Sequence, residues 1–172
     1  MAANPSVTLV LGGARSGKSE WAERLAGALP QPVTYVATAT PSDPDFAARI
    51  EAHRERRPAA WSTVEAGTDL LGVLARLEGT VLVDALGTWL AAVPDFAVDA
   101  PGLCAVLRAR KAKAQTVIVS DEVGLGVHPY TAEGGRFRDA LGSLNRAVAD
   151  VADEVVLVVA GRGLRLPAAG EG

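Results

Sequence analysis

The architecture of this chain follows from one segment, Gly12-Gly13-Ala14-Arg15-Ser16-Gly17-Lys18-Ser19. It matches the pattern G-x-x-x-x-G-K-[ST], in which backbone N–H groups and a lysine cradle the phosphates of a nucleotide. The apolar run 7–11 comes directly before it and helical spacing begins at Ser19, so the loop has the strand and the helix that the motif requires. With this composition, chance produces the motif in only roughly 0.3 % of sequences. We therefore expect a phosphate-binding loop rather than a glycine-rich turn without a ligand.

Outward from this loop, short β-branched runs alternate with longer segments of helical spacing, which is typical of a parallel sheet covered by helices. The expected strands are 7–11, 33–37, 61–65, 80–84, 116–120, 155–159 and 163–166, with 61–65 and 163–166 at the sheet edges. The expected helices are 19–28, 44–57, 68–77, 102–113 and 133–150, with a surface loop over 92–101. We expect an α/β fold, a P-loop NTPase (RecA-like) three-layer sandwich with a mainly parallel central sheet.

Length, charge and composition limit the number of domains, the partners and the location that we expect. The 172 residues suit a single nucleotide-binding domain over residues 1–172. Seventeen Lys and Arg against 20 Asp and Glu give a net charge of -3, so we expect no nucleic-acid partner. No apolar run reaches the roughly 18 residues of a membrane span. The single cysteine, Cys104, cannot form an internal disulfide, and this favours a cytoplasmic location.

The chemistry expected of the loop depends on three side chains. Lys18 would neutralise the β- and γ-phosphate oxygens, and Ser19 would hold Mg²⁺ through its hydroxyl. Asp84 closes the strand 80–84 and is the best candidate for the acid that orients the waters of the metal. The alternative for Asp84 is a cap on the helix that follows it.

The loop alone does not separate a kinase from a nucleotide-dependent switch or a motor, because all three use the same cradle. A guanine-binding switch usually carries Asn-Lys-x-Asp, which this sequence lacks. A motor usually needs a longer chain. We therefore expect a small-molecule transferase.

His53 is one of two histidines, and it lies in the basic segment Arg49-Ile50-Glu51-Ala52-His53-Arg54-Glu55-Arg56-Arg57. At helical spacing it shares a face with Arg49 and with Arg56 or Arg57. One interpretation is a solvated helix with ordinary ion pairs. The other is a nucleophile, because an imidazole with a pKa of about 6.5 is largely free base at neutral pH and arginines can offset charge on a phosphoryl group.

Further motifs follow the loop in a defined order. They are Tyr35-Val36-Ala37-Thr38, Arg49-Ile50-x-x-His53-Arg54-x-x-Arg57-Pro58, Ser120-Asp121-Glu122-Val123-Gly124-Leu125-Gly126, Arg136-Phe137-Arg138-Asp139, Leu141-Gly142-x-x-Asn145 and Ala152-Asp153-Glu154-Val155-x-Leu157-Val158-Val159. With the loop, they resemble the bifunctional adenosylcobinamide kinase/adenosylcobinamide-phosphate guanylyltransferase family over nearly the whole chain. The resemblance implies that the protein phosphorylates adenosylcobinamide with ATP or GTP and then transfers GMP from GTP onto that phosphate.

The resemblance also implies residue roles, a homotrimer, and adenosylcobinamide and its phosphate as partners. The guanylylated histidine of the family corresponds to His53, and Lys18 serves both steps. Glu65 stands where the family has another nucleotide contact, and one carboxylate can accept both N1–H and N2–H₂ of guanine; its alternative is a surface strand residue. The expected metal residues are Ser19 and Asp84. The expected nucleotide-binding residues are Gly12, Gly13, Ala14, Arg15, Ser16, Gly17, Lys18, Ser19, Ala37, Thr38, Ala39, Arg54, Glu55, Arg56, Arg57, Glu65 and Asp84.

The sequence departs from the common family pattern at Ala85, where Cys is frequent, and at Asp121, where Asn is frequent. Two roles are possible for Asp121 and Glu122. They could serve Mg²⁺ or a substrate hydroxyl, or they could be turn and cap residues. Acids near Asp84 or Glu122 are the candidates for accepting the proton of the substrate alcohol. We expect His128, which precedes Pro129, to have no role in catalysis.

Two other functions remain as alternatives. One is a P-loop kinase for another small molecule, which stable GMP labelling would exclude. The other is a GTP-hydrolysing regulatory module, which turnover dependent on cobinamide would exclude.

Overall fold

The computed structural model describes residues 7–39 and 44–168, without the side chains of residues 44–46, 49 and 53. One seven-stranded sheet has the order β3-β2-β4-β5-β1-β6-β7. The strands are β1 (Val7–Gly12), β2 (Val33–Ala37), β3 (Ser62–Glu65), β4 (Thr80–Asp84), β5 (Thr116–Asp121), β6 (Glu154–Val159) and β7 (Arg162–Leu166). Neighbouring strands are parallel, except that β7 runs antiparallel to β6. The mainly parallel sheet and both expected edge strands are confirmed.

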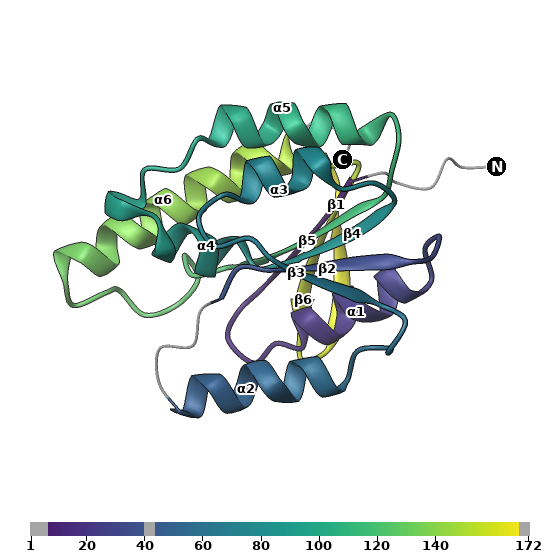
Figure 1. The fold of residues 1–172 in the computed structure, drawn as a ribbon. Helices are drawn as coiled ribbons and strands as arrows, with labels where there is room; N and C mark the ends of the chain where they lie inside the picture. The colour runs from purple at the N-terminus through teal and green to yellow at the C-terminus, as the bar shows by residue number, and fades with distance from the viewer. Residues whose placement is uncertain (1–6, 40–43, 169–172) are drawn as a thin grey trace.

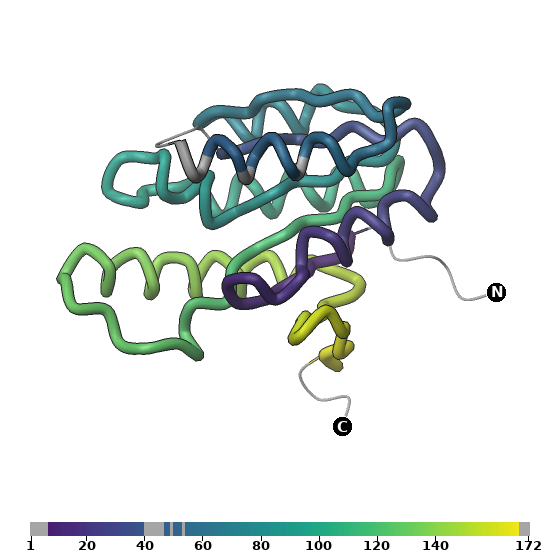
Figure 2. The backbone as a smooth tube through the Cα atoms, turned by 90° about the horizontal axis from the view of Figure 1, so that it is seen from below, coloured from purple at the N-terminus to yellow at the C-terminus, as the bar shows by residue number. Residues whose placement is uncertain are grey.

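Helices cover both faces of this sheet (Figure 1). On one face lie α1 (Lys18–Gly27) and α2 (Pro44–Glu55), and Figure 2 shows both in front of the strands when the molecule is seen from that side. On the opposite face lie α3 (Leu70–Arg76), α4 (Leu86–Ala92), α5 (Ala100–Lys111) and α6 (Ala132–Ala149). The three-layer α/β sandwich is therefore confirmed. Among the helices of the described residues, none has the length and apolar character needed to cross a membrane.

Two apolar clusters fill the spaces between the layers. Side chains alternate along a strand, so neighbouring residues of β1 belong to different clusters. Leu9 packs with the side chains of α3 to α6, whereas Val10 packs with Ala22 and Ala26 of α1. Both clusters consist mainly of buried aliphatic side chains, and burying apolar surface is the main stabilising contribution expected for such a sheet.

The helix α4 has no counterpart among the helices expected from the sequence. Its N-cap residue is Ala85, which lacks the polar side chain that usually marks the start of a helix. Leu86, Trp89 and Leu90 are buried, and the helix has only seven residues. A short apolar run of this kind carries too little periodicity to predict a helix.

Several boundaries differ from the sequence expectation by one or two residues, and those of α5 and α2 have a clear local cause or consequence. α5 begins at Ala100, inside the expected loop 92–101, because the Asp99 side chain accepts a hydrogen bond from the Gly102 N–H and proline is tolerated in the first turn. Residues 94–96 of the same segment form a 3₁₀ turn. α2 ends at Glu55 rather than at Arg57, so the last two arginines lie beyond the helix and do not continue its face.

Parallel pairing brings the carboxyl ends of the strands to one edge of the sheet. Gly12 lies opposite Asp121, and Ala37 lies opposite both Asp84 and Glu65. Ligands of open α/β sheets bind at this edge. The fold therefore gathers the ends of β2, β4 and β5, which are far apart in sequence, next to the phosphate loop after β1.

Candidate nucleotide site

The phosphate loop joins β1 to α1. Gly17 stands directly before α1 with a φ of 87°, a backbone conformation that residues with a Cβ rarely adopt. A Cβ at this position would lie 3.1 Å from the Gly161 Cα. The Gly161 N–H donates to the Ser16 carbonyl at 2.7 Å, so the turn between β6 and β7 holds the loop. The loop is thus fixed at the N-terminus of α1, where free N–H groups and the helix dipole favour an anion.

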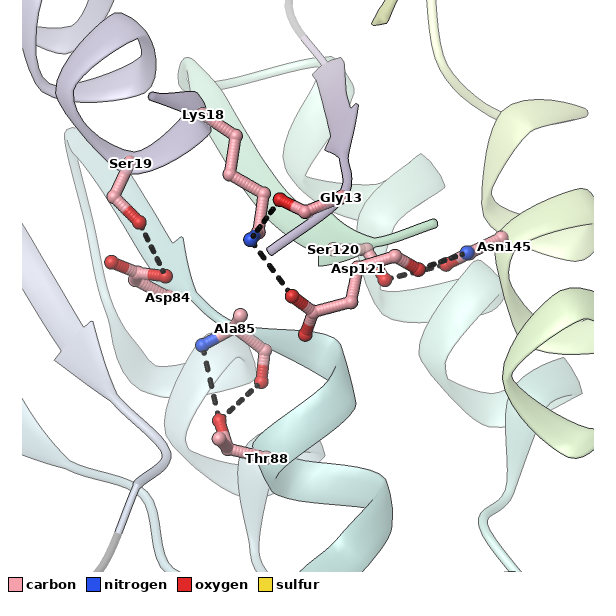
Figure 3. Close-up of polar contacts among 9 residues, drawn as sticks. All are labelled: Gly13, Lys18, Ser19, Asp84, Ala85, Thr88, Ser120, Asp121 and Asn145. Atoms are coloured by element: carbon pink, nitrogen blue, oxygen red, sulfur yellow. Dashed lines mark hydrogen bonds and ion pairs between the residues drawn. The ribbon is translucent and has the colours of Figure 1, made fainter. Parts of the chain in front are cut away.

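Lys18 is held at the centre of the site by two oxygen atoms (Figure 3). Its Nζ donates to the Gly13 carbonyl at 3.2 Å and lies 2.8 Å from Oδ1 of Asp121, while 13 % of the lysine side chain is exposed. Asn145 donates to the Asp121 carbonyl at 3.0 Å and accepts from Ser120, which fixes this end of β5. The structure shows Asp121 in a role that neither alternative named, as the ion-pair partner of the phosphate-loop lysine.

Ser19 and Asp84 come together although they are distant in sequence. The Ser19 Oγ donates to Oδ1 of Asp84 at 3.4 Å, and the Tyr35 hydroxyl donates to Oδ2 of Asp84 at 2.9 Å. Burial raises the pKa of the Tyr35 phenol far above its usual range, and the Asp84 carboxylate raises it further. Tyr35 therefore stays protonated and keeps donating to Asp84. The helix cap proposed as the alternative role of Asp84 is wrong, because Ala85 is the N-cap residue of α4.

Thr38 ties the end of β2 to the start of α4. Its Oγ1 donates to the Ala85 carbonyl at 2.6 Å, accepts from the Ala85 N–H at 2.8 Å and lies 2.6 Å from the Thr88 hydroxyl. The residue is 2 % exposed. The Thr38 hydroxyl is thus engaged within the protein, where it positions the backbone next to Asp84.

Two arginines attach the chain after α2 to the rest of the site. Arg56 lies 3.6 Å from a carboxylate oxygen of Glu23 and 3.9 Å from one of Glu20, both on α1. The Arg57 guanidinium stacks on the Tyr35 ring, 3.8 Å from its centroid, and donates to the Thr63 hydroxyl of β3 at 3.1 Å. These contacts bring the C-terminal end of α2 close to the phosphate loop.

Two adjoining pockets lie at this edge of the sheet, and Lys18 and Ser19 line both. The first has a volume of about 150 Å³ and the second about 340 Å³. The first is lined by Lys18, Ser19, Tyr35, Ala37, Ala39, Ile50, Arg57, Asp84, Ala85, Thr88 and Asp121. The second is lined by Arg15, Ser16, Gly17, Lys18, Ser19, Glu20 and Arg56.

Among the expected site residues whose side chains the structure describes, Arg54, Glu55 and Glu65 do not line either pocket. Arg54 and Glu55 are exposed on α2, and the Arg54 guanidinium lies 4.0 Å from a Glu51 oxygen. Glu65 is exposed at the end of β3. His53 belongs to α2, and its side chain lies outside the described part of the structure. As nucleotide contacts or nucleophile, these residues stay predictions.

Two further residues left open by the sequence have structural partners. Oε1 of Glu122 accepts the Gly124 N–H at 2.8 Å, which agrees with the turn role. His128 Nδ1 lies 3.0 Å from an Arg138 nitrogen on an exposed part of the surface. This contact agrees with a role of His128 outside catalysis.

Tyr35 belongs to the site, although its sequence pattern predicts no role for it beyond its place in the motif 35–38. It lies within an apolar strand, so the sequence predicts a core residue. The structure agrees, because Tyr35 is only 5 % exposed. The available signal was its spacing, because Tyr35 and Ala37 alternate with Val36 and so face the same side of the sheet.

The donor set of the site suits Mg²⁺. Within the described residues, no group of three or more His, Cys, Asp and Glu side chains could hold a metal. The hydroxyl of Ser19 and the carboxylate of Asp84 are oxygen donors that already converge. Mg²⁺ typically takes one or two such protein ligands and fills its other positions with water and substrate phosphate. The residues therefore fit this ion better than a closed structural metal centre.

The site and fold together define a P-loop nucleotide-binding protein. Solved structures share this fold. The flagellar accessory protein FlaH of Methanocaldococcus jannaschii has a TM-score of 0.54 at 15% identity, and a KaiC-like protein of Pyrococcus horikoshii has a TM-score of 0.51 at 13% identity. Each match covers 88% of this chain and 70% of the other.

Sequence comparison gives the family. The family described as cobinamide kinase / cobinamide phosphate guanyltransferase matches residues 8–166. The bifunctional adenosylcobalamin biosynthesis protein CobU of Salmonella typhimurium is 35% identical, over 92% of this chain and 98% of that protein. CobP of Pseudomonas aeruginosa, with the same description, is 38% identical over 95% and 97%. The chain therefore belongs to the cobinamide kinase / cobinamide phosphate guanyltransferase family of enzymes.

Proposed function

We propose that one domain of this chain phosphorylates adenosylcobinamide with ATP or GTP and then joins GMP from GTP to the product through a guanylylated His53. The main support for this proposal is that the phosphate loop and the segment that follows α2 line the same pocket. Lys18, Ser19 and Asp84 line it from the phosphate loop and β4, and Arg57 lines it from the end of the helix with His53. One nucleotide cradle next to that helix suits two successive reactions of nucleotide phosphates.

In the kinase step, the substrate hydroxyl oxygen forms a bond to the γ-phosphorus while the bond to the β-phosphate oxygen breaks, and the nucleoside diphosphate leaves. Lys18 and the loop N–H groups hold the phosphoryl oxygens in place. Ser19 and Asp84 would hold Mg²⁺, which supplies neutralisation of the phosphate charge when it is bound. The Asp84 and Asp121 carboxylates line the same pocket and are the candidates to accept the hydroxyl proton.

In the guanylyl step, a His53 nitrogen forms a bond to the α-phosphorus of GTP, and pyrophosphate leaves with the electron pair of the broken P–O bond. An oxygen of cobinamide phosphate then attacks the same phosphorus, and the N–P bond breaks to return the imidazole. Arg56 and Arg57, which follow the helix, offset the negative charge on the phosphoryl oxygens.

We also propose a homotrimer in the cytoplasm. A corrinoid is too large for a chain of 172 residues to enclose alone, so contacts between subunits would complete its site. The loop between β5 and α6 exposes Leu125, Val127 and Tyr130, which supply apolar surface for such contacts. Cys104 is free and buried, which suits a reducing compartment.

The two histidines allow a direct test. We expect His53→Ala to accumulate adenosylcobinamide phosphate from adenosylcobinamide and GTP without forming the GMP-bearing product. His128→Ala is the matched control and should keep the wild-type ratio of the two products, because His128 contacts Arg138 on the surface and no part of the phosphate loop. Chromatography of the corrinoid products measures both steps. Formation of the GMP-bearing product by His53→Ala at the wild-type rate would overturn the proposal.

A further inference from the structure

We propose that Tyr35 is a positioning residue that connects the two halves of the site. Its hydroxyl fixes the Asp84 carboxylate for the metal and the phosphate loop, and its ring seats Arg57 at the end of the helix that carries His53. The first part concerns nucleotide binding alone, and the second part rests on the proposed role of His53.

The Tyr35 hydroxyl contacts Asp84, the carboxylate proposed to bind the metal. Tyr35 donates to Oδ2 of Asp84 at 2.9 Å, while Oδ1 of the same carboxylate accepts from Ser19 at 3.4 Å. The two contacts use different oxygens, so the phenol sets the orientation of the carboxylate and leaves Oδ1 directed at Ser19. A hydrogen bond from behind a metal-binding carboxylate typically changes metal affinity by about 10- to 100-fold.

The ring has a separate partner. Arg57 stacks 3.8 Å from the ring centroid and donates to Thr63, the residue of β3 that lies directly opposite Tyr35 in the sheet. Arg57 therefore rests on two neighbouring strands at once. Because it follows α2 by only two residues, this seat determines where the C-terminal end of that helix lies.

The position of Tyr35 makes it rigid enough for this role. It lies in the middle of β2, hydrogen-bonded in the sheet between β3 and β4, and 5 % of the residue is exposed. A buried side chain with a hydrogen-bonded hydroxyl and a stacked ring has few alternative rotamers. Because Tyr35 is fixed in β2, its hydroxyl positions the Asp84 carboxylate and its ring positions the Arg57 guanidinium.

Two substitutions separate these roles. Tyr35→Phe removes the hydroxyl and keeps the ring for Arg57, whereas Tyr35→Leu removes both. Thr34→Val is the matched control, because it removes a hydroxyl of the same strand that accepts from Ser62 and touches neither Asp84 nor Arg57 in the described contacts. Circular dichroism and thermal unfolding confirm that each variant is folded.

Calorimetric titration with the β,γ-imido analogue of GTP tests the hydroxyl without any turnover. We expect Tyr35→Phe to raise the Mg²⁺ concentration that half-saturates the gain in nucleotide affinity by about tenfold. Nucleotide affinity in EDTA should match the wild type, and Thr34→Val should behave as the wild type throughout. An unchanged Mg²⁺ dependence in Tyr35→Phe would overturn this part of the inference.

The rate of protein guanylylation relative to the rate of cobinamide phosphorylation tests the ring. Tyr35→Phe should keep the wild-type ratio, and Tyr35→Leu should lower it about tenfold or more, because only the second variant loses the seat of Arg57. Equal ratios in the two variants would overturn the ring's role. If the wild-type protein is not guanylylated on His53, the proposed nucleophile and the ring's role fail together, and the Mg²⁺ titration still decides the role of the hydroxyl.

Discussion

Lys18 combines a strong charge with a restrained position. Its ammonium group is held by the Gly13 carbonyl and the Asp121 carboxylate at the mouth of the loop. A phosphate that enters the loop gains a partly buried cation whose geometry is already fixed, and such charge-assisted hydrogen bonds are worth more than neutral ones. The residue therefore contributes to nucleotide binding in both proposed steps.

We expect Lys18→Ala to weaken the binding of GTP by about 10- to 100-fold, since a hydrogen bond to a charged group contributes about 1.5 to 3 kcal/mol. Fluorescence titration with a labelled nucleotide measures this loss. Lys113→Ala is the matched control, because Lys113 is exposed at the end of the sheet away from the loop. Similar affinities for the two variants would contradict the role given to Lys18.

Residues of the site differ in how far the sequence revealed them. The spacing of the loop predicted Lys18 and Ser19, and the position of Asp84 at a strand end placed it as their partner, which the 3.4 Å contact with Ser19 agrees with. The ion pair of Asp121 with Lys18 depends on the pairing of β1 with β5, which no local pattern contains. Tyr35 was hidden because a buried tyrosine in a strand reads as core.

At the scale of elements, most strands and helices follow from periodicity, and the exceptions have local causes. α4 lacks a polar N-cap, and α5 begins earlier than expected because Asp99 caps it ahead of a proline. The early end of α2 matters for the site, because Arg56 and Arg57 lie beyond the helix, where they contact α1 and β2.

The helix α6 contains two adjacent glycines with different surroundings. A Cβ on Gly135 would meet no atom within 4 Å, whereas a Cβ on Gly134 would lie 2.9 Å from the Pro129 Cβ and 3.1 Å from Oγ1 of Thr131, the N-cap residue. We expect Gly135→Ala to raise the free energy of unfolding by about 0.5 to 1 kcal/mol, because alanine is the better helix former. Gly134→Ala should gain less or lose stability. Urea unfolding of both variants measures the difference, and equal gains would contradict the packing described for this helix start.

At the scale of the whole molecule, the fold class follows from the alternation of strands and helices, but the strand order does not. The order β3-β2-β4-β5-β1-β6-β7 depends on contacts between segments far apart in sequence. The meeting of the ends of β2, β4 and β5 next to the loop is therefore a property of the folded chain, and it explains why the site could be predicted only in part.

The proposed trimer is also a property at this scale. We expect light scattering to give three times the mass of one chain at working concentration. Val127→Asp should shift the mass toward that of a monomer, because Val127 is 87% exposed on the apolar loop between β5 and α6. Leu164→Asp, at the exposed β7 edge of the sheet, is the control and should leave the trimer intact. A monomeric wild-type protein would contradict the assembly.

The proposed two-step reaction requires a covalent bond between the His53 imidazole and GMP, and peptide mapping can locate that bond. After incubation with GTP and Mg²⁺, trypsin should release the peptide 50–54, which contains His53 and ends at Arg54. This peptide should carry GMP through a bond that is stable in alkali and cleaved in acid, as a phosphoramidate is. GMP attached to any other peptide, or a peptide 50–54 that stays unmodified under conditions where the GMP-bearing product forms, would contradict it.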